Sequence, residues 1–68
     1  MKIDNDLVVQ VQLKATGANI HKVAGKLSVY KFYAGLGDNC SVESRDRFNG
    51  MAQLIEQDLR KFVATGIL

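Results

Sequence analysis

The feature that most constrains the fold is the segment LVVQVQLK at residues 7–14, in which apolar and polar side chains alternate. A two-residue period is typical of a half-buried β-strand, whose successive side chains point to opposite faces of a sheet. We therefore predict a strand over residues 7–14. One face is apolar and carries Val9, Val11 and Leu13, and the other is polar and carries Gln10, Gln12 and Lys14.

The last third of the chain predicts an amphipathic helix over residues 41–65. Its apolar residues recur at helical spacing and form one stripe. Ser41 is placed to cap the start, Gly66 to end the helix, and Glu56 and Arg60 to form a pair one turn apart. The stripe consists of Phe48, Met51, Ala52, Ile55, Leu59, Phe62 and Val63.

The middle segment, residues 19–34, fits two structures. As a helix it places Ile20, Val23, Leu27, Tyr30 and Ala34 on one face, and Gly35 is suited to end it. As a strand, residues 27–33 are rich in β-formers and can pair with residues 7–14 in a hairpin. The first alternative gives an α+β fold in which an N-terminal strand, paired across a homodimer, precedes two helices. The second gives a β-hairpin of two or three strands, covered by one long C-terminal helix.

The size and residue usage of the chain limit how it is stabilised and what it does. We expect one small domain over residues 1–68 and a homodimer, because a core of this size gives little margin for folding alone. One cysteine and one histidine exclude a disulfide framework and do not make a typical zinc site. No enzyme motif is present, so we expect no catalytic residues, no metal and no cofactor. The acidic opening does not resemble a signal peptide, and we expect a cytoplasmic protein.

Charge is distributed unevenly along the chain, although the net charge is only +2. No acidic residue occurs between Leu7 and Gly37, and this interval holds four lysines and the histidine. We interpret this basic half as the candidate contact surface for an anion.

With a helical middle segment, the order of strand, helix and helix resembles the ribbon-helix-helix repressors over most of the chain. The resemblance implies a dimeric DNA-binding regulator in which Gln10, Gln12 and Lys14 contact bases in the major groove. It also implies that Asn39, Cys40 and Ser41 approach a phosphate at the start of the last helix. Lys22 and Lys26 would add backbone attraction. Thr16-Gly17 and the long interval before Gly37 depart from the family's pattern.

With a β-hairpin instead, we expect a protein-binding module. A small, basic domain without motifs suits a phage or plasmid inhibitor, or an adaptor, that occupies a surface of a host protein. In either fold the candidate core or interface residues are Val9, Val11, Leu13, Phe48, Ile55, Leu59 and Phe62.

Overall fold

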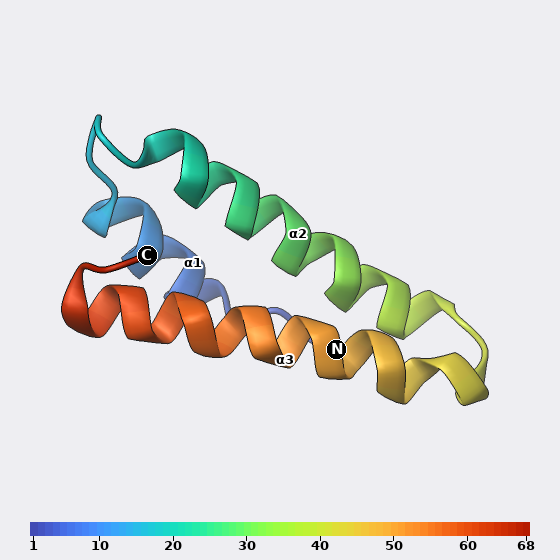
Figure 1. Ribbon diagram of the computed structural model, residues 1–68. Helices are drawn as coiled ribbons and strands as arrows, with labels where there is room; N and C mark the ends of the chain where they lie inside the picture. Colours follow the sequence, from blue (N-terminus) through green and yellow to red (C-terminus); the bar gives the residue numbers. More distant parts are fainter.

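A computed structural model describes residues 1–68 as three helices with no strand (Figure 1). Helix α1 spans Asn5–Lys14, α2 spans Ile20–Asn39 and α3 spans Val42–Thr65. The helices α2 and α3 run antiparallel and are joined by a tight turn (Figure 1). They spread apart toward the other end, where the short α1 packs against them, mostly on α3. The molecule measures 39 × 19 × 17 Å, so its length is about that of α3 alone.

The predicted strand over residues 7–14 is wrong, because this segment forms α1. Adjacent valines at positions 8 and 9 give the segment a helical apolar pattern as well as an alternating one, with Leu7, Val8 and Val11 buried on one face. Asp4 favours the helix, because its carboxylate accepts a hydrogen bond from the Leu7 N–H at 3.2 Å and so caps the first turn. The predicted α+β fold and its β-hairpin alternative are both overturned by this helix.

The change from strand to helix also moves the side chains that we expected in the core. Val11 is buried as expected, but Val9 is 53% exposed and Leu13 is 81% exposed. The reason is the change of period, since residues two apart lie on the same face of a strand but on opposite sides of a helix. Val8, which the strand placed outward, is buried instead.

The ambiguous middle segment is helical and belongs to α2. The helix does not end at Gly35 but continues to Asn39. Gly37 is buried where α2 and α3 approach most closely, and a Cβ at this position would collide with the side chain of Asn49. A glycine in this turn of α2 therefore permits close packing of the two helices rather than stopping the first.

Helix α3 occupies almost the range expected for the C-terminal helix. Ser41 is its N-cap residue, although its side chain does not cap a backbone N–H, and Gly66 ends it with a φ of 75°. The Gly66 N–H donates to the Phe62 carbonyl at 2.7 Å. This left-handed terminal residue is a conformation that glycine adopts without strain.

The core is a single cluster of 10 buried apolar residues drawn from all three helices. At least as many large apolar side chains are exposed as are buried. No helix combines the length and the apolar character needed to span a membrane. The core consists of Leu7, Val8, Val11, Val23, Leu27, Tyr30, Ala34, Ala52, Leu59 and Phe62.

Candidate functional site

Helix α2 carries two apolar stripes, and only one of them is covered by the rest of the chain. The inner stripe consists of the buried residues Val23, Leu27, Tyr30, Ala34 and Gly37. The outer stripe consists of Gly25, Val29, Phe32 and Leu36, at alternating intervals of four and three residues. That spacing places the four residues along one side of a helix. Val29 is 42% exposed and Phe32 is 61% exposed, so the middle of the outer stripe is left largely uncovered, whereas Leu36 is half-buried.

The outer stripe borders a groove between α2 and α3. Gly25 and Val29 line the groove from α2, Ile55 lines it from α3, and Leu68 closes one end. Its volume is about 530 Å³. A Cβ at Gly25 would meet no atom within 4 Å, so the groove has room for a larger side chain at this residue. Met51, one turn before Ile55 on α3, is 40% exposed and extends the apolar surface toward the α2–α3 turn.

Basic side chains border this groove. Lys22 and Lys26 lie along its α2 side, and Lys61 lies beside Lys26 in an adjoining hollow. The Lys26 ammonium forms an ion pair with Asp58 at 3.2 Å. Lys22 and Lys61 form no ion pair with the chain. The rim therefore has two unpaired cations, and its one side-chain carboxylate is already paired.

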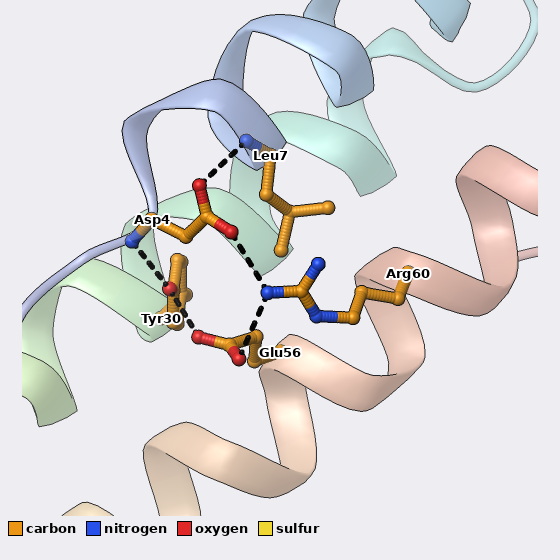
Figure 2. A network of polar contacts seen from close by, with 5 residues as sticks. All are labelled: Asp4, Leu7, Tyr30, Glu56 and Arg60. Carbon is orange, nitrogen blue, oxygen red and sulfur yellow. Dashed lines mark hydrogen bonds and ion pairs between the residues drawn. The ribbon is translucent and has the colours of Figure 1, made fainter.

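A polar cluster joins α2 and α3 to the residue that precedes α1 (Figure 2). The Tyr30 hydroxyl donates to a Glu56 oxygen at 2.6 Å and accepts from the Asp4 N–H at 3.0 Å. Arg60 donates from one nitrogen to Asp4 at 2.8 Å and to Glu56 at 3.3 Å. The expected pair between Glu56 and Arg60 is confirmed, and it belongs to this larger cluster.

A second cleft lies beside this cluster, between residues 1–6 and α3. Its lining is mostly polar, and two of its carboxylates, those of Asp4 and Glu56, are already bonded within the cluster. Nowhere in the structure do three His, Cys, Asp or Glu side chains gather as a metal site would require. The cluster therefore holds the helices together, and the groove is the stronger candidate for binding.

The cluster makes stability depend on pH through Asp4. The Arg60 guanidinium, assisted by the Leu7 N–H, lowers the pKa of the Asp4 carboxyl below its ordinary value. A lowered pKa in the folded state adds stability above the ordinary aspartate pKa of about 3.9, and this stability is lost as the pH falls through the lower folded value. We expect Asp4→Asn to lower the urea midpoint at pH 7, with the difference from wild type disappearing by about pH 2.

Asparagine caps helices about as well as aspartate, so this substitution removes the ion pair and keeps the cap. Asp6→Asn is the matched control, since Asp6 is an exposed carboxylate in the same helix and has no ion pair. A difference between Asp4→Asn and wild type that stays constant from pH 7 to pH 2 would contradict the assignment of this stability to ionised Asp4.

The structure separates the residues that we expected to contact bases. Gln10 and Lys14 lie one turn apart on the same side of α1, whereas Gln12 lies on the opposite side. Asn39 and Ser41 lie at the α2–α3 turn, where the Asn39 amide donates to the Gly35 carbonyl and the Ser41 hydroxyl donates to Ser44. Of the predicted set, only Lys22 and Lys26 line the groove.

No family model, curated protein or solved structure matches the chain. The resemblance to the ribbon-helix-helix repressors rested on the strand that α1 replaces. A function is therefore inferred from the geometry of the molecule alone.

The outer stripe of α2 was not among the candidate sites predicted from the sequence. Its signal is present in the sequence as the regular spacing of Gly25, Val29, Phe32 and Leu36. The inner stripe has the same kind of spacing, and the two stripes interleave along one segment. Only the structure shows which of them faces α3.

Proposed function

We propose that this chain is a non-enzymatic protein-binding module that receives an α-helix of a partner protein in the groove between α2 and α3. The observation that carries the proposal is the outer stripe of α2, an unpartnered apolar surface that continues across the groove to Ile55. Amphipathic helices bind such grooves through residues at intervals of three and four. The interaction is of the adaptor or inhibitor type, in which the module occupies a surface of its partner.

The groove favours a helix over other ligands for a physical reason. From Gly25 to Leu36 the outer stripe covers three turns of α2, a length of about 17 Å. A helix that lies alongside the stripe presents its side chains at the same repeat. It forms its own backbone hydrogen bonds and so needs none from the module. A peptide that binds as an added β-strand would need a sheet edge to receive its backbone hydrogen bonds, and the chain has no strand to provide one.

The proposal is tested by a substitution that fills the groove and leaves the fold intact. In Gly25→Leu the new side chain enters open space, and the substitution also removes a glycine from a helix interior. We expect the free energy of unfolding to rise by about 0.5–1 kcal/mol. We expect this variant to lose binding at least about tenfold, or about 1.4 kcal/mol, toward helical peptides selected on the wild type from a displayed library with a fixed apolar stripe.

Gly50→Leu is the matched control. Gly50 is also in a helix interior with open space at its Cβ, but it does not line the groove. The selected peptides should bind this control as they bind the wild type, and they should shift the NMR signals of Gly25, Val29 and Ile55. Peptides that bind Gly25→Leu and wild type equally, or a library that yields no binder, would overturn the proposal.

A further inference from the structure

The charges of the rim indicate what kind of helix enters the groove. Two cations, Lys22 and Lys61, border it without a partner, and the one side-chain carboxylate, Asp58, is paired with Lys26. Both of these lysines lie at the end of the groove that Leu68 closes. A bound helix therefore lies along an apolar surface with positive charge on its borders.

A second copy of this chain does not complement that surface. A symmetric dimer can place the grooves of two copies face to face in two ways. Either the equivalent ends of the two grooves meet, or the opposite ends meet. The first arrangement sets Lys22 and Lys61 near the same two lysines of the second copy, and the second sets them near the other end of its groove, whose lining has no acidic side chain. Asp58 is the one side-chain carboxylate beside the groove, and it already neutralises Lys26. Like charges brought together across an interface disfavour that pairing.

Nucleic acid fits the surface less well than an acidic helix. A duplex is bound mainly through many lysine and arginine contacts to its phosphates. Here the cations are few, and the surface between them is apolar, with Val29, Phe32 and Met51 exposed. Burying those side chains requires apolar surface on the ligand, which a phosphate backbone does not offer.

We infer that the partner is an acidic amphipathic helix of another protein, with an apolar stripe that meets Val29 and Ile55 and carboxylates that pair with Lys22 and Lys61. This inference rests on the proposed function and specifies its ligand. The charged rim sets which helices are accepted, and the apolar floor supplies most of the affinity.

Two synthetic helical peptides of about 18 residues, or about 27 Å, test the inference. Both carry the same apolar stripe, and the flanking positions are glutamate in one and lysine in the other. At about 50 mM salt we expect the acidic peptide to bind the wild type at least tenfold more tightly by fluorescence anisotropy, a preference that shrinks as added salt screens the charges. The double variant Lys22→Glu/Lys61→Glu should reverse the preference.

The control variant is Lys2→Glu/Lys31→Glu, which changes the net charge by the same amount at exposed positions that do not line the groove. It should keep the preference for the acidic peptide. If both peptides bind the wild type equally, the inferred charge of the partner is wrong and the groove remains a helix site. If neither peptide binds, the proposed function fails together with the inference.

Two further outcomes would overturn the acidic helix as the partner. One is a random-sequence DNA duplex that displaces the acidic peptide at about 150 mM salt and binds more tightly than the peptide does. The other is a wild-type dimer at micromolar concentration, seen by analytical ultracentrifugation, that Gly25→Leu dissociates. A wild type that stays monomeric and keeps the acidic peptide in the presence of the duplex supports the inference.

Discussion

Phe62→Ala is expected to unfold much of the population of this protein at room temperature. Phe62 is fully buried and belongs to the core shared by the three helices. Truncating a buried phenylalanine typically costs about 3–5 kcal/mol, from lost apolar burial and from the cavity that is left. A single core in a chain of this length rarely supplies more than about 3–5 kcal/mol of stability, so the loss approaches the total. Urea titration followed by circular dichroism measures it.

Phe32→Ala is the control for this experiment, because it removes the same side chain from a position that is 61% exposed. We expect it to change the free energy of unfolding by about 0.5 kcal/mol or less. The two substitutions should therefore differ severalfold in effect. A loss below about 1 kcal/mol in Phe62→Ala, with a cooperative transition retained, would mean that Phe62 is not packed as the structure describes.

Tyr30→Phe is expected to lower the free energy of unfolding by about 1–3 kcal/mol, although it removes one oxygen atom. The Tyr30 hydroxyl lies between two partners, since it donates to Glu56 and accepts from the Asp4 N–H. Its removal leaves a carboxylate and a backbone donor, both partly buried, without this bond. The loss of stability comes from leaving the Glu56 carboxylate and the Asp4 N–H without this partner, because the ring stays in place.

The change in the free energy of unfolding at alkaline pH distinguishes the contribution of the Tyr30 hydroxyl from the contribution of ring packing. Burial, with a further contribution from the hydrogen bond to Glu56, raises the pKa of Tyr30 in the folded protein. The stability linked to its proton is complete below the ordinary tyrosine pKa of about 10 and is lost as the pH rises through the higher folded value. Wild type should therefore lose its advantage over Tyr30→Phe above about pH 10.

Tyr33→Phe provides the matched comparison, since Tyr33 is half-buried and stacks on Phe48, with ring centroids 6.3 Å apart. We expect this variant to retain nearly the stability of the wild type across the pH range. An effect of Tyr30→Phe no larger than that of Tyr33→Phe would show that the cluster contributes little to the fold.

The residues explain why the helix over residues 41–65 was predictable and the first element was not. The last helix has one long apolar stripe, a serine before it and a glycine after it, and all of these indicate the same structure. The segment 7–14 is too short for its periodicity to distinguish a strand from a helix, because its adjacent valines fit both an alternating and a helical apolar pattern. The deciding contact is the Asp4 cap, whose carboxylate also pairs with Arg60, 56 residues away.

The candidate site was less predictable than the fold. Lys22 and Lys26 were singled out for their charge, and they do border the groove. Val29, Phe32 and Met51 look like ordinary core residues in the sequence, and only the placement of α1 leaves them uncovered. A local pattern reports which residues share a face of a helix, but not which of two apolar faces the neighbouring helices cover.

Because α2 has two apolar stripes, burial of apolar surface alone does not determine which side of the helix faces the rest of the chain. Val23, Leu27 and Ala34 on one side are balanced by Val29, Phe32 and Leu36 on the other, so turning the helix would exchange one apolar surface for another. The Tyr30 hydroxyl breaks this symmetry, because it meets Asp4 and Glu56 in only one rotational setting. The polar cluster thus decides which surface of α2 is left for a partner.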